Sequence, residues 1–223
     1  MDLPLIRLAT VDSTQAFLKR NAHLGFCAVL ADRQSEGRGR QGNRWESAAG
    51  TGLWMSAALL APPGVPPGLL LQRAMAAAAR VLDPEGATLG LKWPNDLVAW
   101  RAGHLVKLGG ILGEQSGGHL ILGLGVNLTE APEIPGRAIP PASLRDLGLE
   151  LPSTLDLAIL ITKSWNGLEQ EYQVPFRWPE AGTSIRWEEG QGTCLGWDSD
   201  GRLKVTTAEG IQRLSAGDVA GMS

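Results

Sequence analysis

The apolar positions of this chain form short continuous runs, separated by turns that are rich in glycine and proline. An apolar run of about four to eight residues between turn residues is typical of a buried strand. Residues 61–68, APPGVPPG, predict a rigid surface connection between two elements. Residues 101–103 predict the turn of a hairpin. We therefore predict strands over residues 3–8, 26–31, 53–60, 89–93, 98–100, 105–112 and 119–128.

Three other segments carry the pattern of helices. Residues 12–14, DST, offer an N-cap for a short helix that runs to about residue 22, and capping is the simplest role for the two hydroxyls. Residues 69–82 are alanine-rich and apolar nearly all round, which predicts a largely buried helix. A third helix is expected over residues 153–172. Its predicted apolar face consists of Leu157, Leu160, Ile161, Trp165 and Leu168.

The pattern changes after Pro179, where short alternating segments replace the long ones. Residues 198–201 and 208–210 have the aspartate and glycine content of hairpin turns. This pattern predicts a small barrel-like β module over residues 179–223, after a larger domain over residues 1–178. Its expected strands are 183–187, 193–197, 203–207 and 211–214.

Composition and charge narrow the functional classes. The net charge of −3 argues against general binding to nucleic acid or to a membrane surface, because either would need a basic stripe. Cys27 and Cys194 are far apart and form no CxxC motif, so neither a zinc site nor a disulfide framework is indicated. The chain starts without a secretory signal pattern, and no apolar run approaches the ~20 residues that span a bilayer. We expect a cytoplasmic protein.

Residues 37–42, GRGRQG, are the most unusual stretch of the chain. No hydrophobic residue occurs from residue 32 to residue 44, and three glycines rule out a stable helix. Glycines let backbone amides approach a ligand closely, and guanidinium groups suit phosphate or carboxylate oxygens. An anion-binding loop is one interpretation. For this hexapeptide alone, an ordinary solvated turn is favoured.

Two further features suggest a ligand without proving one. Residues 92–96, KWPND, place three polar or charged groups beside a Trp-Pro pair where a strand ends. Gly109, Gly110, Gly123 and Gly125 lie inside predicted strands, which glycine weakens. A flat ligand against the sheet would explain them, and so would bulges or tight packing of helices on the sheet. Both explanations stay open from the residues alone.

Taken together and in this order, the motifs identify a protein family much more specifically than any one of them does alone. They are STQ at residues 13–15, GRGRQG at 37–42 with Trp45, KWPND at 92–96, KLGGIL at 107–112 and GLGVN at 123–127. The set resembles the biotin–protein ligases (biotin–acetyl-CoA-carboxylase ligases) from about residue 13 to the C-terminus. The resemblance implies an α+β fold: a catalytic domain of the class II aminoacyl-tRNA synthetase and biotin-ligase type, with a mixed β-sheet flanked by helices. It also implies that the C-terminal module is SH3-like.

The resemblance implies a reaction in two steps. The carboxylate of biotin attacks the α-phosphate of MgATP, which gives biotinyl-5′-AMP and pyrophosphate. A lysine amine of a biotin carboxyl carrier protein then attacks this anhydride and releases AMP. Mg²⁺ is expected to arrive on the phosphates of ATP, without a dedicated protein site.

Four residues carry the implied catalytic roles. Lys107 would lie between the biotin carboxylate and the α-phosphate, and Arg40 would hold the phosphate of the adenylate. Arg38 would close over biotin and the leaving pyrophosphate. Positive charge at these places suits a reaction that joins two anions. Asp96 is expected to orient the incoming lysine or a Mg²⁺.

The other implied contacts divide between the two halves of the ligand. Hydroxyl and amide side chains suit the ureido ring of biotin, which needs a donor and acceptors. Trp45 is expected to pack over the valeryl chain or near the adenine, while Gly110 and Gly125 leave space for the bicyclic ring. The residues expected to contact biotin or the adenylate are Ser13, Thr14, Gln15, Gln34, Arg38, Gly39, Arg40, Trp45, Lys107, Gly110 and Gly125. Those expected to contact the nucleotide are Arg40, Trp45, Asn95, Asp96 and Asn127.

The chain departs from the family pattern at Gln15 and at Glu36, which precedes the GRGR motif. The family commonly has asparagine where Gln15 stands, which affects a biotin contact. Glu36 stands where a small uncharged residue is usual, and its carboxylate should slightly oppose phosphate binding. Salt would screen that effect if the carboxylate is exposed.

Two rival functions remain at this point: a lipoate–protein ligase of the same fold superfamily, and a sensor that binds biotin or nucleotide without catalysis. Some family members carry an N-terminal winged-helix repressor domain. Twelve residues precede Ser13, fewer than the ~50 that a domain needs, so we expect a ligase that does not bind DNA. An exposed sheet edge beside the ligand loops would suit a homodimer.

Overall fold

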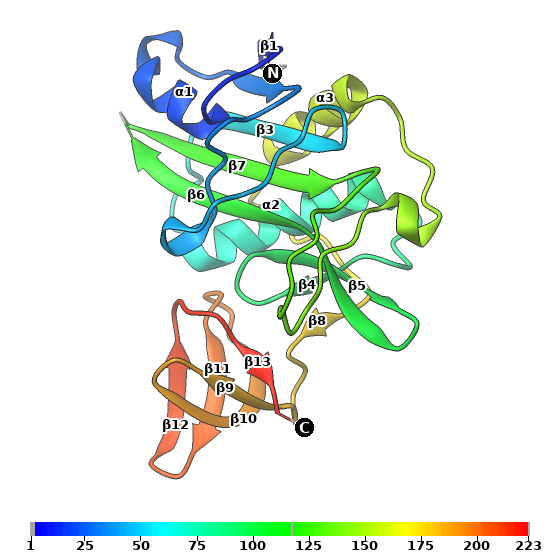
Figure 1. The fold of residues 1–223 in the computed structure, drawn as a ribbon. Helices are drawn as coiled ribbons and strands as arrows, with labels where there is room; N and C mark the ends of the chain where they lie inside the picture. The colour runs from blue at the N-terminus through cyan, green and yellow to red at the C-terminus, as the bar shows by residue number, and fades with distance from the viewer. Residues whose placement is uncertain (1–2, 117, 223) are drawn as a thin grey trace.

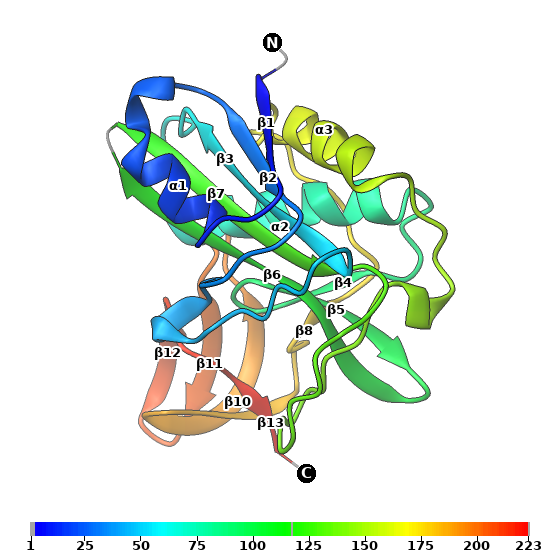
Figure 2. The same cartoon turned by 45° about the horizontal axis from the view of Figure 1, so that its top comes forward.

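Two β-sheets organise the protein, of which this computed structural model describes residues 3–116 and 118–222. Eight strands form the larger sheet, and five strands form the smaller one toward the C-terminus. Figures 1 and 2 show the smaller sheet as a separate body beside the larger one, reached through the segment that contains β8. The change of pattern after residue 179 therefore coincides with a change of sheet.

The larger sheet is mixed, as the resemblance implied. Its order is β1–β2–β3–β7–β6–β5–β4–β8. The β1–β2 and β4–β8 pairs are parallel, and the remaining pairs are antiparallel. The strands are β1 (Leu5–Leu8), β2 (Ala28–Ala31), β3 (Gly52–Leu59), β4 (Gly90–Lys92), β5 (Asp96–Arg101), β6 (His104–Ser116), β7 (His119–Asn127) and β8 (Arg177–Trp178).

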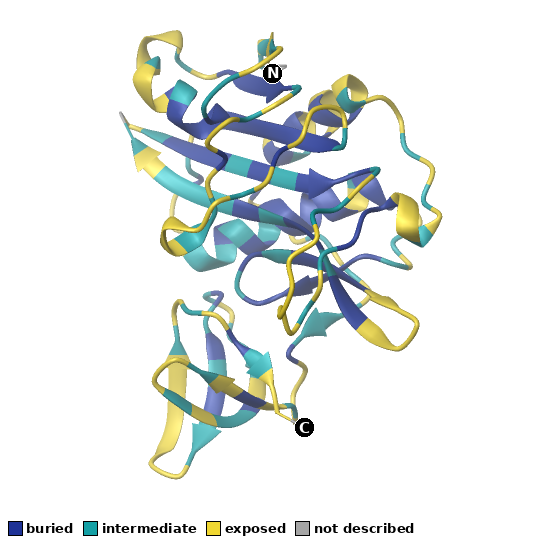
Figure 3. Ribbon diagram, in the orientation of Figure 1, coloured by how far each residue is buried: buried dark blue, intermediate teal, exposed yellow. Residues whose placement is uncertain are grey.

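Helices cover both faces of the larger sheet. Ala28 and Ala57 face the main core with helices α2 (Pro67–Leu82) and α3 (Thr154–Trp165), whereas their neighbours Val29 and Ala58 pack against helix α1 (Thr14–Arg20). Strand β3 is buried along its whole length, while buried and half-buried positions are mixed along β7, as Figure 3 shows. Three short 3₁₀ helices complete this part: η1 (Ala22–Leu24), η2 (Arg40–Gly42) and η3 (Arg145–Leu147).

Two expectations about the third helix were wrong. The helix ends at Trp165, capped by Asn166, rather than near residue 172. Gly167 follows the cap, and glycine is a poor helix former. Leu160 is also 45% exposed, because the buried stripe centres on Leu157 and Ile161, and Leu160 lies beyond its edge.

The smaller sheet is antiparallel, with the order β12–β11–β10–β9–β13. The two predicted hairpin turns join β10 to β11 and β11 to β12. No sequence pattern indicated β13, which has only two residues. In the described chain no pairing joins β12 to β13, so the sheet does not show the closure expected of a barrel. Its strands are β9 (Ser184–Trp187), β10 (Gly190–Trp197), β11 (Leu203–Thr207), β12 (Gly210–Leu214) and β13 (Ala220–Gly221).

Trp93 joins the two sheets. It follows β4 of the larger sheet, yet its ring is fully buried in the core of the smaller one. Its Nε1 donates a 3.1 Å hydrogen bond to the carbonyl of Gly201, which also accepts from Nε2 of Gln72 on α2 at 2.7 Å. The other buried members of this core are Ile185, Cys194, Leu203, Val205 and Val219.

Truncation of Trp93 should weaken this junction. We expect Trp93→Ala to lower the free energy of unfolding by about 3–5 kcal/mol, because the substitution opens a cavity in a small core. Urea denaturation monitored by circular dichroism measures this. Trp100→Ala is the matched control, since Trp100 lies on β5 with 51% of its surface exposed and should cost less than half as much. Equal losses for the two variants would contradict an anchoring role for Trp93.

Candidate functional site

One cavity of about 830 Å³ collects the residues that the sequence motifs singled out. Its walls come from the start of α1, the loop after β2, strands β4 to β7, residues 132–141 and the smaller sheet. All fourteen predicted residues line it. They are Ser13, Thr14, Gln15, Gln34, Arg38, Gly39, Arg40, Trp45, Asn95, Asp96, Lys107, Gly110, Gly125 and Asn127.

The glycine-arginine loop is a closed hairpin. The amide of Gly39 donates to the carbonyl of Asn43 at 2.8 Å, and the amide of Trp45 donates to the carbonyl of Gly37 at 2.9 Å. A side chain at Gly37 would collide with the Trp45 carbonyl, so the two arms can approach this closely only with glycine there. Arg38 lies on one arm of this hairpin, paired with Arg44, and Arg40 lies at its tip.

The two arginines of this loop differ in their surroundings. Arg38 is exposed, and its guanidinium forms no hydrogen bond or ion pair with the part of the chain that the structure describes. Arg40 instead reaches across the cavity, where its Nη1 donates to Oδ1 of Asn95 at 3.2 Å and to the carbonyl of Gly217 at 3.0 Å. The loop is therefore linked through Arg40 to both sheets.

A chain of polar side chains forms another wall. Oε1 of Gln34 accepts from the backbone amide of Thr14 at 2.8 Å, and Nε2 of Gln34 donates to Oγ of Ser47 at 2.9 Å. Oγ1 of Thr14 also lies 2.8 Å from Oγ of Ser56. Ser13 accepts from the amide of Ala16 at 3.4 Å, so the predicted helix cap is confirmed. This wall offers fixed donors and acceptors to a polar ring.

The glycines of β6 and β7 make room for different neighbours. Gly125 faces the indole ring of Trp45, which occupies the space that a side chain would need. Gly123 makes room in the same way for the amide of Gln15. Gly109 instead packs against the backbone of β7, beside a register shift between β5 and β6. Tight packing therefore explains Gly109, while Gly123 and Gly125 admit side chains of the site.

Two buried groups of this region lack partners among the described residues. They are Nε2 of Gln15 and Nε1 of Trp45, and both residues line the cavity. A buried donor without a partner is unfavourable by about 1–3 kcal/mol, so such a group favours an acceptor on a ligand. Because the Trp45 ring stands against Gly125, a ligand that lies on Gly125 has to displace this ring.

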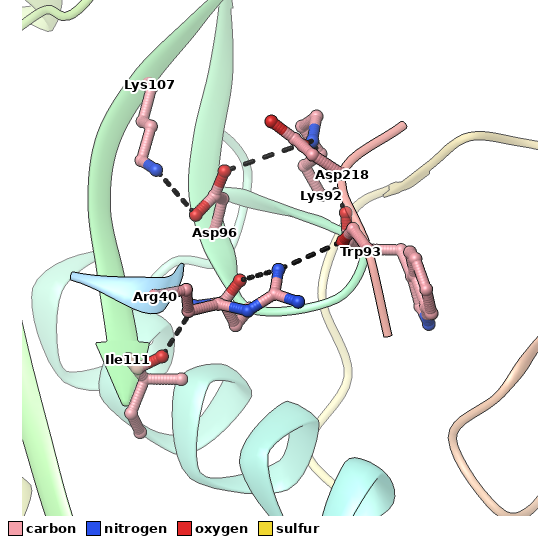
Figure 4. A network of polar contacts seen from close by, with 9 residues as sticks. Arg40, Lys92, Trp93, Asp96, Lys107, Ile111 and Asp218 are labelled. Atoms are coloured by element: carbon pink, nitrogen blue, oxygen red, sulfur yellow. Dashed lines mark hydrogen bonds and ion pairs between the residues drawn. The ribbon is translucent and has the colours of Figure 1, made fainter. Parts of the chain in front are cut away.

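Two lysines and two aspartates form the charged part of the site (Figure 4). Nζ of Lys107 lies 2.7 Å from Oδ1 of Asp96, and Nζ of Lys92 lies 4.0 Å from Oδ2 of the same carboxylate. Lys92 has a second partner at 2.7 Å, Oδ1 of Asp218. Only 5% of the Lys92 side chain and 12% of Asp96 are exposed, whereas Asp218 is 70% exposed. The ammonium groups and carboxylates alternate through the cluster.

The backbone fixes Lys107 from both sides. Lys107 pairs with Val98 on β5, and the register shift between Leu97 and Val98 falls at this point. On its other side, the amide of Lys107 donates to the carbonyl of Pro140, and its carbonyl accepts from Ala142, both at 2.9 Å. Irregularities of this kind often re-aim a side chain beside a site. Lys107 is therefore held as part of the sheet.

The cavity has an excess of positive charge. Seven lysines and arginines line it against four aspartates and glutamates, although the chain as a whole carries a net charge of −3. Partial loss of water would raise the pKa of Asp218, but the neighbouring charges of Lys92, Lys107 and Arg40 outweigh it and lower the pKa of this carboxyl. Asp218 is thus anionic at neutral pH, and the cavity suits ligands with several negative charges.

Asn95 and Asn127, which were predicted to contact the nucleotide, form hydrogen bonds with the backbone of the cavity wall. Nδ2 of Asn95 donates to the carbonyl of Ile111 at 2.6 Å, while its Oδ1 holds Arg40. Nδ2 of Asn127 donates to the carbonyl of Ala142 at 3.1 Å. Each of these side chains therefore fixes a segment of the cavity wall.

Sequence reasoning missed several parts of the site. Lys92 stands in the KWPND motif but received no role, and Asp218 lies in no motif at all. Ser47 and Ser56 carry the polar wall, and residues 132–141 contribute a further side. A lysine at the end of a buried strand was a usable signal for Lys92. Asp218 offered none, because it is 122 positions from Asp96.

Clusters of metal-binding side chains and exposed thiols are both lacking among the described residues. The described residues contain no group of three or more His, Cys, Asp or Glu side chains arranged to hold a metal ion. Cys27 and Cys194 are free and buried, and burial raises the pKa of both thiols. None of the helices in the described chain combines the length and apolar character needed to cross a membrane.

Two known proteins are similar to this chain in sequence over most of its length. A biotin–acetyl-CoA-carboxylase ligase of Mycobacterium tuberculosis is 32% identical over 238 residues, covering 95% of this chain and 86% of that protein. The bifunctional ligase/repressor BirA of Bacillus subtilis is 29% identical over 242 residues, covering 95% of this chain and 71% of that protein.

Solved structures agree with these relatives. A biotin protein ligase from Aquifex aeolicus in complex with biotin and ATP superimposes with a TM-score of 0.77 at 27% identity, over 98% of both chains. One from Leishmania major in complex with biotinyl-5-AMP gives a TM-score of 0.63 at 25% identity, over 96% of this chain and 99% of that one.

The family model of the biotin/lipoate A/B protein ligases matches residues 9–127. This range is more than half of the chain, and it contains all fourteen of the predicted site residues. The chain therefore belongs to the biotin/lipoate A/B protein ligase family, among its biotin protein ligases.

Proposed function

We propose that this protein joins biotin to one specific lysine of the biotin carboxyl carrier protein of acetyl-CoA carboxylase or a related enzyme. The reaction consumes ATP and passes through biotinyl-5′-AMP, releasing first pyrophosphate and then AMP. The observation that carries the proposal is the convergence of Lys107, Arg38 and Arg40 with a polar wall in one cavity. Free, buried thiols agree with a cytoplasmic location, where thiols stay reduced.

The polar wall supports the assignment of the biotin side. The amide of Gln34 and the hydroxyls of Thr14 and Ser56 are fixed by one another, so little side-chain freedom is lost when a ureido ring binds. The unpartnered Nε2 of Gln15 supplies one more donor at this end. A glutamine in place of the usual asparagine fits here because Gly123 leaves it room.

The cations support the assignment of the first step. The biotin carboxylate and the α-phosphate repel each other, and a charge between them lowers that repulsion as the P–O bond forms and pyrophosphate leaves. Lys107 is suited to this place because Asp96 and the backbone on both sides hold it. Arg40 would hold the phosphate of the adenylate. Arg38, whose guanidinium has no partner among the described residues, is available to close over biotin and pyrophosphate.

The carrier lysine completes the reaction in the second step. Its neutral amine attacks the carbonyl carbon of the anhydride, the C–N bond forms and AMP leaves. Asp96 is our candidate for orienting this lysine. Its carboxylate is also a fitting oxygen ligand for a Mg²⁺ that arrives with ATP, because such ions bind through one or two carboxylates and the phosphates. That ion would neutralise phosphate charge.

The overall reaction is tested with biotin, MgATP and a biotin carboxyl carrier domain. We expect the mass of biotin less one water to appear on a single carrier lysine, and pyrophosphate exchange into ATP that requires biotin. Mass spectrometry and radiolabel exchange measure these. Exchange that requires lipoate instead would make the protein a lipoate–protein ligase. Biotin binding without adenylate formation would make it a sensor.

Lys107 is the most direct test of the first step. We expect Lys107→Ala to reduce the rate of adenylate formation by about 10²- to 10³-fold, because a charge is lost where negative charge gathers. Single-turnover formation of biotinyl-AMP measures it. Lys204→Ala, on β11 outside the cavity, is the matched control and should keep the wild-type rate. A Lys107→Ala enzyme as fast as the control would remove Lys107 from the mechanism.

Arg40 is expected to retain the intermediate. In Arg40→Gly, the adenylate should dissociate faster, and the released anhydride should label lysines of an unrelated protein such as serum albumin. Release of labelled biotinyl-AMP on rapid gel filtration, together with albumin labelling, provides the measurement. Arg33→Gly, an exposed arginine outside the cavity, is the control. Equal retention by both variants would refute this role of Arg40.

A further inference from the structure

The segment 217–219, which leads into β13 of the smaller sheet, borders the charged part of the cavity. Two of its residues contact charged groups there, and the third is anchored in the small core. The carbonyl of Gly217 accepts from Arg40, and the carboxylate of Asp218 pairs with Lys92. Val219 is 2% exposed, in the same small core as Trp93. The buried neighbour on one side and the hydrogen-bonded carbonyl on the other hold Asp218 in position.

Lys92 needs the partner that Asp218 supplies. Its side chain is 5% exposed, and a buried ammonium is unfavourable unless a charged group and hydrogen bonds compensate for lost water. Asp218 gives it a charge-assisted hydrogen bond of 2.7 Å. The other contacts are weaker, with the carbonyl of Trp93 at 3.4 Å and the ring of Trp178 at 5.6 Å.

Asp96 is the only other carboxylate in contact with Lys92 among the described residues, and Lys107 already uses it. Lys92 lies 4.0 Å from one oxygen of Asp96, while Lys107 lies 2.7 Å from the other. If Asp218 were neutral, Lys92 would gain by moving to Asp96. The carboxylate would then be shared between two ammonium groups, and Lys107 would be held less firmly.

We propose that Asp218 is a positioning residue of the first half-reaction, which acts by holding Lys92 so that Asp96 remains the partner of Lys107. This inference rests on the proposed ligase function and extends it. It makes the smaller sheet a contributor to the charge arrangement of the catalytic cavity. Asp218 needs no contact with either reactant for this role.

The first test compares two substitutions of Asp218. We expect Asp218→Asn to lower kcat/KM for ATP in biotin-dependent pyrophosphate exchange by about tenfold or more, since a charged hydrogen bond is lost at nearly unchanged shape. Asp218→Glu keeps the charge and should recover activity to within about threefold of wild type. Transfer of biotin from preformed biotinyl-AMP to the carrier, in which Asp96 also takes part, should fall less than exchange does in Asp218→Asn.

A matched control removes an ion pair elsewhere in the smaller sheet. Asp198 pairs with Arg213 at 2.6 Å and lies outside the cavity, so Asp198→Asn should leave exchange unchanged. The inference is overturned if Asp218→Asn exchanges like wild type, or if Asp218→Glu is as impaired as Asp218→Asn. A defect confined to transfer would also overturn it, because Asp218 would then serve the acceptor lysine.

The second test measures the Lys92–Asp218 pair without any assay of activity. The free energies of unfolding of Lys92→Met, Asp218→Asn and the double variant form a double-mutant cycle. We expect the combined loss to be smaller than the sum of the single losses, and strict additivity would overturn the pairing on which the inference depends. A wild-type enzyme without any exchange would instead refute the proposed function, whatever this cycle gives.

Discussion

The burial of Trp93 in the core of the smaller sheet is the constraint on which the site depends. Lys92, Asn95 and Asp96 flank this residue along the chain, and all three line the cavity. In Figure 4 the indole ring of Trp93 points away from the charged groups around it. Because a large, fully buried ring has little freedom to move, it fixes the backbone around Trp93. The side chains of Lys92, Asn95 and Asp96 are thereby held in place. One five-residue motif therefore joins two cores and supplies charges to the space between them.

Like charges can be collected in a cavity when opposite charges or neutral oxygens hold them before a ligand arrives. Asp96 and Asp218 do this for Lys107 and Lys92, while Arg40 is held by neutral oxygens of Asn95 and Gly217. The remaining excess of positive charge is available to phosphates and a carboxylate. Such an arrangement is ready in advance, so little reorganisation accompanies binding. The alternation of ammonium groups and carboxylates also explains why Asp218, which is far from the other three residues in the sequence, is part of the site.

The sequence predicted the local features well and the distant contacts poorly. Apolar runs located seven of the eight strands of the larger sheet and missed only the two-residue β8. The motifs placed Arg40, Asp96 and Lys107, which the structure brings into one cavity. Residues 217–219 could not be foreseen, because their place depends on how the smaller sheet packs against Trp93. The end of α3 was misjudged because Leu168 continues the apolar pattern past Gly167, and burial alone does not need a helix.

The glycine-arginine loop, which resembled a solvated turn when considered alone, is tied into this arrangement at two points. Arg40 links it to both sheets, and the Trp45 ring rests against Gly125 on β7. An anionic ligand that binds Arg40 would break the hydrogen bonds of Arg40 to Asn95 and Gly217. A flat ligand that packs on Gly125 would displace the Trp45 ring, so the loop must change its position in both cases. Binding must therefore exchange these contacts for contacts with the ligand, and the closed hairpin of residues 37–45 can move as one piece when it does. The loop's own hydrogen bonds preserve its shape, while its attachment to the cavity is replaceable.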